Sequence, residues 1–288
     1  MRAVSRSHAA ITIVNALPNG IGAAVGIDLH VAVEASVETA DREALTVEPR
    51  SSETPVVREA VREALSLVPR ESPLAARLSI SSDVPMAVGL KSSSAVATAV
   101  VGAVAAAVGL RPSPETVARH SAISARRAGV SATGAFDDAL AGLRTGVVVT
   151  DNGRDSLLCR WPVDPALGVV LWIPEGRHAP SPELHERFRR HAAAARHAAD
   201  AATAGRIWEA MAMNSDVVDT VMGYDRRELV GRLRRHGALA AGTSGLGPAL
   251  AAVAPRERLD ALVAEMDRAP GVVRTVSFST SESPEGGA

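Results

Sequence analysis

A loop of small and polar residues, Pro85-Met-Ala-Val-Gly89-Leu-Lys91-Ser-Ser-Ser94-Ala95, leads into an alanine- and valine-rich run that ends at Leu110. This pattern predicts a short loop followed directly by a buried helix. Gly89 can adopt positive φ and lets a ligand approach the backbone closely, while the serines supply an N-cap hydroxyl and further free hydroxyls. Because the first N–H groups of a helix lack internal partners and the dipole makes that end positive, we expect an anion here, most often a phosphate.

Lys91 is the only lysine in the chain, and the other side chains that are always positively charged are all arginine. Because an ammonium and a guanidinium are not interchangeable at a phosphate, the lone lysine strengthens the prediction of a phosphate site. The loop is not a Walker A motif, since Leu90 stands where that motif has glycine. A hydroxyl beside a bound phosphate can also reach its magnesium ion. The alternative is that the serines only cap a structural helix.

The composition limits the function classes that are open to the chain. It has 288 residues, enough for one large domain or two small ones, and a formal net charge of -1, which does not indicate a nucleic-acid partner. A single cysteine, Cys159, excludes intrachain disulfides and fits a reducing compartment. The longest apolar run is shorter than the roughly 20 residues of a spanning helix. We therefore expect a cytoplasmic protein without membrane or nucleic-acid partners, as a monomer or a homodimer.

Two adjacent carboxylates, Asp137 and Asp138, lie among glycine, alanine and threonine between Gly129 and Gly142. Small apolar neighbours are not typical of a solvated surface, so we expect a confined site. One carboxylate could act as a general base toward a hydroxyl, or both could serve a metal. The alternative is helix N-capping without chemistry.

A second glycine-rich loop follows near the C-terminus, over Ala241-Gly-Thr-Ser-Gly-Leu-Gly-Pro-Ala249. Together with the first loop and the carboxylate pair it suggests phosphoryl transfer, in which a carboxylate orients the acceptor hydroxyl. Strict alternation over Ile27 to Val37 predicts a half-buried strand with Asp28 on its polar face, either toward a ligand or simply toward water. We also expect one long Ala/Arg helix after Pro182, and a capping box at Asp225 and Glu228.

The first loop resembles the phosphate loop of the GHMP small-molecule kinases, and its Gly-Leu-Lys-Ser-Ser-Ser form is similar to that of archaeal-type shikimate kinases. Three further segments agree in order and spacing. They are Ala10–Ala16 with Gly22–Asp28, Thr133–Ala139 through Asn152, and Ser244–Ala249.

The resemblance implies an α+β, two-lobed GHMP kinase fold with a ferredoxin-like C-terminal half. It implies an N-terminal nucleotide-binding domain over residues 1–153, a C-terminal domain over 154–279 and a disordered tail over 280–288. The implied reaction converts shikimate and ATP, with Mg²⁺, to shikimate 3-phosphate and ADP.

The resemblance also implies roles for single residues. Asp137 and Lys91 would be catalytic, and Ser93 would ligate magnesium. The ATP phosphates would contact residues of both glycine loops: Pro85, Gly89, Leu90, Lys91, Ser92, Ser93, Ser94, Ala95, Gly245 and Gly247. The substrate would contact the remaining motif residues: Asn15, Gly22, Asp28, Thr133, Gly134, Asp137, Asp138 and Ser244.

Some positions depart from the pattern that the resemblance leads us to expect. Ile21 stands where lysine is usual, and Leu246 stands where threonine is usual. Arg126 and Arg127 lie where the wider superfamily often has a magnesium-binding glutamate. There are therefore two alternatives. One is a kinase acting on another hydroxylated carbocyclic acid in specialised metabolism, and the other is a non-catalytic nucleotide or metabolite sensor.

Overall fold

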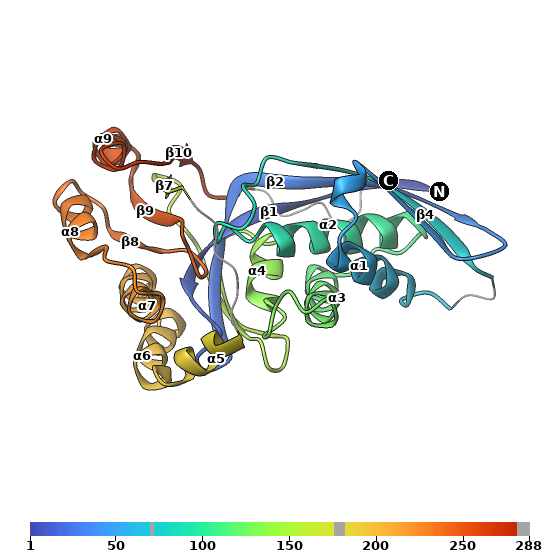
Figure 1. The fold of residues 1–288 in the computed structure, drawn as a ribbon, viewed down its shortest axis with the longest axis horizontal. Helices are drawn as coiled ribbons and strands as arrows, with labels where there is room; N and C mark the ends of the chain where they lie inside the picture. The colour runs from blue at the N-terminus through green and yellow to red at the C-terminus, as the bar shows by residue number, and fades with distance from the viewer. Residues whose placement is uncertain (70–71, 176–181, 281–288) are drawn as a thin grey trace.

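The computed structural model describes residues 1–69, 72–175 and 182–280 and consists of two β-sheets with helices packed on them (Figure 1). The first sheet has six strands. They are β1 (Arg2–Val14), β2 (Ile21–Thr39), β3 (Ala44–Glu48), β4 (Leu74–Ser82), β5 (Val147–Asp151) and β6 (Ser156–Trp161). The long strand β2 organises this sheet: β1 pairs along one edge, while β4 and β5 pair with opposite ends of it.

Four helices cover one face of this sheet (Figure 1). They are α1 (Pro55–Leu65), α2 (Ser92–Ala107), α3 (Pro114–Arg127) and α4 (Phe136–Ala141). Helix α2 is buried along most of its length because it carries alanine and valine with no charged residue. Its N-cap is Lys91 in the left-handed conformation, φ 66°, so the predicted serine cap is wrong. Ser92, Ser93 and Ser94 are instead the first helical residues.

The C-terminal half has a four-stranded antiparallel sheet of β7 (Leu167–Ile173), β8 (Ala240–Thr243), β9 (Leu250–Pro255) and β10 (Val272–Val276). The spatial order β10-β7-β9-β8 places the chain's fourth, first, third and second strands side by side, which is the ferredoxin-like arrangement. The predicted α+β class with a ferredoxin-like half is therefore confirmed.

The helices of this half are α5 (Pro182–Arg189), α6 (Ala192–Thr203), α7 (Ile207–Met222), α8 (Arg227–Arg235) and α9 (Leu259–Met266). The expected single Ala/Arg helix is thus two helices, α5 and α6. Helix α8 has Arg226 as its N-cap, with no side-chain cap, so the capping box expected at Asp225 is wrong.

The two halves share one hydrophobic core. Ile27 of β2, Val169 of β7 and Ala251 of β9 belong to the same buried cluster. Strand β6 pairs with β5 in the first sheet, so the strands change sheets between Trp161 and Leu167, and the boundary at residue 153 stays a prediction. Of the tail predicted after residue 279, residues 281–288 lie outside the described residues.

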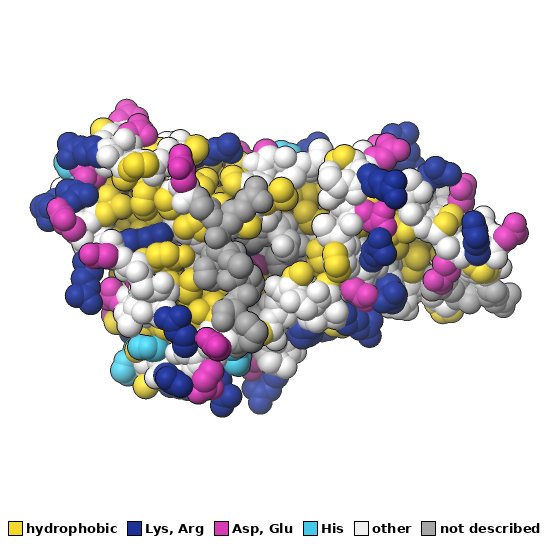
Figure 2. Space-filling model, viewed as in Figure 1, with side chains coloured by type: hydrophobic (Ala, Val, Ile, Leu, Met, Phe, Trp, Pro, Cys, Tyr) yellow, Lys and Arg dark blue, Asp and Glu magenta, His cyan; other side chains and the backbone are white. Residues whose placement is uncertain are grey.

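The surface carries no extended field of one charge on the face shown in Figure 2, where acidic and basic side chains are interspersed. In the described part of the chain, no helix has both the length and the apolar character needed to cross a membrane.

Phe136 is the first residue of α4, the helix that carries the adjacent carboxylates, and it is fully buried. We expect Phe136→Ala to lower the free energy of unfolding by about 3–5 kcal/mol, because it removes a large core side chain and leaves a cavity. Leu158→Ala, at a half-exposed position of β6, should change it by less than about 0.5 kcal/mol. Urea denaturation measures both, and similar losses in the two variants would contradict the placement of α4 on the core.

Candidate active site

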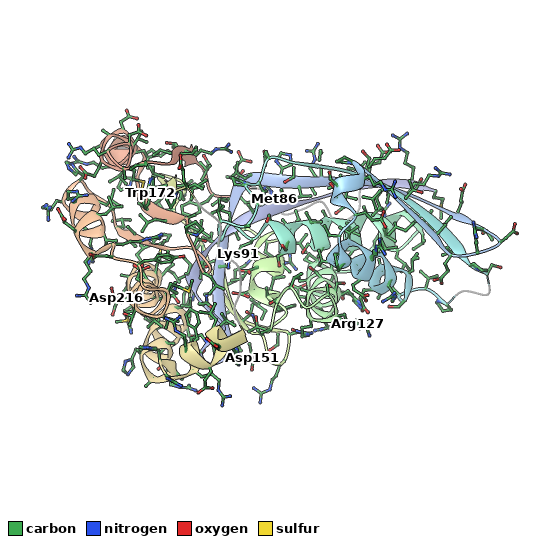
Figure 3. All side chains as sticks on the ribbon, in the orientation of Figure 1. Met86, Lys91, Arg127, Asp151, Trp172 and Asp216 are labelled. Carbon is green, nitrogen blue, oxygen red and sulfur yellow. The ribbon has the colours of Figure 1, made fainter. Side chains whose placement is uncertain are left out.

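A cavity of about 480 Å³ lies where the two halves meet, and Lys91 lies at the same place near the middle of the molecule (Figure 3). Its volume is in the range of small-molecule sites. Five separate segments line it: the chain after β1, the loop before α2, the stretch from the end of α3 to the start of α4, helix α5, and the loop between β8 and β9. The predicted phosphate loop, carboxylate pair and second glycine loop therefore meet at one site.

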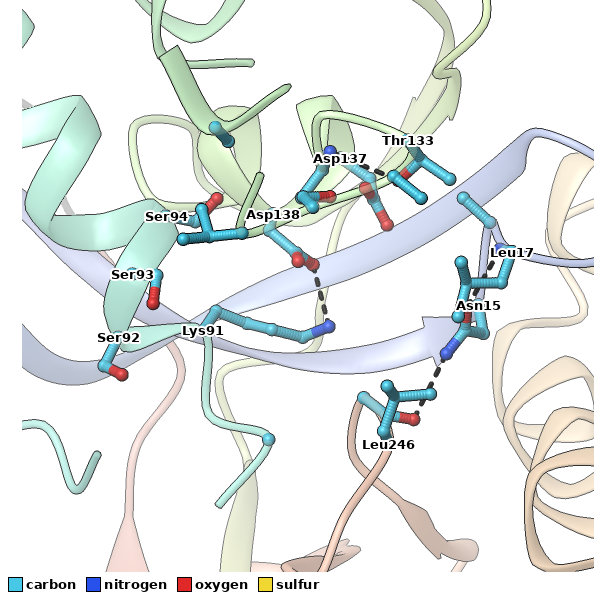
Figure 4. Close-up of a pocket in the computed structure, with 18 of the residues that line it drawn as sticks. Asn15, Leu17, Lys91, Ser92, Ser93, Ser94, Thr133, Asp137, Asp138 and Leu246 are labelled. Carbon is cyan, nitrogen blue, oxygen red and sulfur yellow. Dashed lines mark hydrogen bonds and ion pairs between the residues drawn. The ribbon is translucent and has the colours of Figure 1, made fainter. Parts of the chain in front are cut away.

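The loop before α2 presents its backbone and serines to this cavity. Gly89, Lys91 and the three serines line it, with the serines on one side of Lys91 (Figure 4). The Ala95 N–H bonds to the Lys91 carbonyl oxygen at 2.9 Å, so the N–H groups of Ser92 to Ser94 precede the first such bond of the helix. This is the geometry of an anion site.

Three residues that were predicted to contact the nucleotide do not line the cavity. Leu90 and Ala95 are buried in the core on either side of the polar loop, and Pro85 lies before it. Leu90 and Ala95 anchor the loop instead of facing its ligand.

The loop between β8 and β9 packs directly on the phosphate loop. The Ser244 hydroxyl donates to the Gly89 carbonyl oxygen at 2.8 Å, and a side chain on Gly89 would overlap the Ser244 carbonyl. Ser244 is fully buried and also accepts from the Thr12 N–H at 3.2 Å. It therefore supports the loop from behind, while Gly245 and Gly247 line the cavity.

Asn15 closes the site on the side opposite the serines (Figure 4). Its side-chain amide donates to the Gly245 carbonyl at 3.2 Å, and its backbone N–H donates to Asn214 on α7 at 2.8 Å. Thr133, Leu17 and Leu246 line the same side.

Asp137 and Asp138 both line the cavity and are only 4% and 9% exposed. Asn152 fixes Asp137: its amide nitrogen donates to Asp137 Oδ1 at 2.7 Å, and its Oδ1 accepts from the Asp137 N–H at 3.3 Å. The Thr150 hydroxyl donates to the same Asn152 Oδ1 at 2.7 Å, which sets the orientation of the amide. On the other side of Asp137, a Cβ on Gly22 would overlap the carboxylate.

Asp138 forms an ion pair with Lys91, whose Nζ lies 3.0 Å from Asp138 Oδ1 (Figure 4). Burial and the charge of Asp137 raise the pKa of Asp138 to about 7, against the opposing effect of Lys91. Burial and Asp137 thus oppose ionisation of Asp138, and the ion pair with Lys91 favours it.

Comparisons with known proteins agree with this arrangement. Residues 56–146 match the family model for the GHMP kinases N terminal domain. The chain is 33% identical to the shikimate kinase of Halobacterium salinarum over 273 residues, covering 92% of this chain and 93% of the relative. It is 34% identical to that of Pyrococcus abyssi, covering 91% and 95%. The chain belongs to the archaeal-type shikimate kinase family of the GHMP kinases.

The fold agrees as well. The structure of Methanococcus jannaschii mevalonate kinase superposes with a TM-score of 0.74 at 14% identity, covering 97% of this chain and 99% of that one. A homoserine kinase from Cytophaga hutchinsonii gives 0.71 at 16% identity, covering 96% and 95%. The GHMP kinase fold predicted from the loops is therefore confirmed.

Four of the substrate residues implied by the family resemblance do not line the cavity. Gly22 packs against Asp137 and Ser244 against Gly89, and the other two are Asp28 and Gly134. Asp28 is exposed on β2 and lines a separate depression with Arg274. Gly134 packs against the guanidinium of Arg126. Conversely, no role was assigned to Asn152, although Thr150-Asp-Asn152 at the end of a strand was a visible signal of a polar group near the carboxylates.

In this kinase, Gly22→Ala should displace Asp137 without removing any polar group. A displacement of this kind near reacting atoms can lower kcat by about 100-fold. The matched control is Gly231→Ala in α8, where a Cβ meets only the end of Arg235 and alanine favours the helix. Steady-state kinetics measures both, and equal kcat values would show that Gly22 does not constrain the carboxylate.

Proposed function

We propose that this protein transfers the γ-phosphoryl group of ATP to the 3-hydroxyl of shikimate, giving shikimate 3-phosphate and ADP. The observation that carries the proposal is the meeting of Lys91, the serine-lined helix start and the Asp137–Asp138 pair in one cavity between the two halves. These are the groups that phosphoryl transfer needs: positive charge and N–H donors for the phosphates, and a carboxylate for the acceptor.

In the proposed reaction, Asp137 accepts the proton of the acceptor hydroxyl, and the hydroxyl oxygen of the acceptor forms a bond to the γ-phosphorus. The bond from that phosphorus to the bridging oxygen breaks and ADP leaves with the electron pair. Asn152 holds Asp137 through Oδ1, which leaves the second carboxylate oxygen to receive the proton. Positioning of this kind supplies much of the catalysis in phosphoryl transfer.

Lys91 would move between two partners. Without nucleotide it pairs with Asp138, and with nucleotide its ammonium would contact the phosphate oxygens beside the serine N–H groups. Asp138 can take up a proton when the lysine leaves, because its pKa is already raised to about 7.

The residues present fit a magnesium ion that arrives with ATP. Ser93 offers a hydroxyl at the helix start, and the described residues contain no group of three or more His, Cys, Asp or Glu side chains that would bind a metal by themselves. Mg²⁺ is usually held by substrate phosphates and few protein ligands. When bound it would neutralise phosphate charge, which Lys91 alone cannot do beside two carboxylates.

The acceptor side of the cavity fits a ring with an apolar face. Leu17 and Leu246 line the cavity and pack on a cluster that contains Leu184 and Phe188 of α5. Leu246, which departs from the usual threonine, is thus supported from behind by apolar side chains. The same apolar surface favours, as a second candidate, a kinase for a different hydroxylated carbocyclic acid.

The decisive assay is ADP release with ATP, magnesium and shikimate, beside a control without acceptor. Asp137→Asn should lower kcat by about 10²–10⁴-fold, because the amide cannot accept the hydroxyl proton. Shikimate-dependent turnover that is equal in the variant would refute the role of Asp137. ATP binding without turnover of shikimate would refute the substrate, and a panel of hydroxylated carbocyclic acids would then be tested.

The raised pKa of Asp138 makes folding depend on pH in a defined direction. Between pH 4 and 7 the folded protein keeps a proton that the unfolded chain releases, so the free energy of unfolding should fall as pH rises through this range. Asp138→Asn lacks this titrating group. The free energy of unfolding of the variant minus that of the parent should therefore increase when the pH is raised from 5 to 8. Urea denaturation at the two pH values measures the difference, and an equal offset at both would contradict the burial of an ionisable group at 138.

A further inference from the structure

The short turn between β5 and β6 contacts Asp137 at its beginning and helix α3 at its end. Asn152, at its beginning, holds the carboxylate and the backbone N–H of Asp137. Asp155, at its end, is 9% exposed and receives a two-pronged ion pair from Arg126 of α3, with Nη1–Oδ1 at 3.0 Å and Nη2–Oδ2 at 2.5 Å. Arg119 of the same helix also donates to the Asp155 carbonyl at 3.5 Å.

The guanidinium of Arg126 also holds the loop that precedes α4. Its Nη1 donates to the carbonyl oxygen of Thr133 at 3.2 Å. Gly134, at φ 80°, leaves the space that the guanidinium fills, since a Cβ there would overlap Arg126 Nη1. The contact with Arg126 therefore explains why position 134 has a glycine.

The local sequence contributes one side-chain bond to the start of α4, from the Ala135 N–H to the Thr133 hydroxyl at 3.3 Å. Its N-cap is Ala135 at φ 54°, a conformation that costs a non-glycine residue about 1–2 kcal/mol, and alanine has no side chain that could cap the helix. The side chain that accepts from the first turn is that of Asn152, which receives the Asp137 N–H from the turn between β5 and β6. Asp137 and Asp138 lie in the first turn of this helix, so any shift of its start moves both carboxylates. The surrounding structure must hold the start in place.

We propose that Arg126 is a positioning residue for the phosphotransfer site: through Asp155 and Thr133 it fixes the start of α4 and thereby the direction of Asp137. The contacts form a closed ring, from Asp137 to Asn152, along the turn to Asp155, through Arg126 to Thr133 and back to α4. A lysine cannot replace the arginine, because one ammonium cannot reach both oxygens of Asp155 and the Thr133 carbonyl with the same fixed fork.

The chain contains a matched control for this inference at the neighbouring position. Arg127 also pairs with a buried carboxylate, that of Glu63, which in turn contacts His120. The ion pair of Arg127 is with Glu63, which does not line the cavity, and Arg127 lies well apart from Lys91 in Figure 3. Arg126→Lys and Arg127→Lys therefore each lose one arginine–carboxylate pair, and only the first loses the support of α4.

The experiment compares the two variants by kinetics and by hydrogen exchange of the apoprotein. In Arg126→Lys we expect kcat/KM for the acceptor to fall by about tenfold or more, with the KM for ATP unchanged, because the donor side is built by the other loop. Amide exchange over residues 133–138 should be faster than in the parent. Arg127→Lys should match the parent in both measurements.

A double variant separates positioning from stability. Arg126→Met leaves the carboxylate of Asp155 unpaired, while Arg126→Met with Asp155→Asn removes both charges, keeps a residue type that tolerates the positive φ at position 155, and should regain thermal stability. If Arg126 acts by orienting α4, activity stays low in the double variant although the midpoint of thermal unfolding recovers. Activity that returns with stability would overturn the inference.

The kinetic readout rests on the proposed function, and the exchange readout does not. Absence of shikimate turnover in the parent protein would refute the proposed substrate and leave the exchange comparison intact. Equal exchange over residues 133–138 in the two lysine variants would refute the role of Arg126, whatever the substrate is.

Discussion

The close approach of the two glycine loops is the constraint on which the site depends. Ser244 donates to the Gly89 carbonyl, the Ala249 N–H donates to the Val88 carbonyl at 3.0 Å, and the Gly245 N–H donates to the Thr12 hydroxyl at 2.8 Å. Each bond joins the C-terminal half to the N-terminal half. A cavity exists between the halves because glycine at 89 allows backbone to approach backbone, and any side chain there would force the loops apart.

Strained backbone is concentrated around this cavity. Among the described residues, four non-glycine residues have positive φ: Ala87, Lys91, Ala135 and Asp155. Two belong to the phosphate loop, and two belong to the ring of contacts that fixes α4. Such conformations persist only where the surroundings hold them, and they cluster where side chains or N–H groups must point in one direction. In this protein the strained residues direct a lysine and two carboxylates toward the same space.

Most of the proposed donor side of the site could be predicted from the sequence, because it is encoded within one short segment. Gly89, Lys91 and the three serines are adjacent, so their proximity needs no knowledge of the fold. The exact cap could not be predicted: a serine is the usual N-cap, but here Lys91 takes that place in a left-handed conformation. The preference of serine for the N-cap position is overridden because contacts with Ser244 and Asp138, which are distant in the sequence, stabilise the loop.

The proposed acceptor side is built differently, which explains why its residues were harder to predict. Thr133, Leu184 and Leu246 come from three segments spread over more than a hundred positions, and only the folded chain brings them together. Asp28 fits the strand pattern and the family position, but its side chain lies outside the cavity. Alternation predicts only that a side chain is on the polar face of a strand, and it does not tell whether a ligand or water lies against that face. Leu246 sits in a loop whose glycines keep the phosphate geometry, while its side chain belongs to the apolar cluster of α5 and α7. One loop thus carries two separable constraints: its glycines allow the close packing on Gly89, and the side chain at position 246 is held by the apolar cluster.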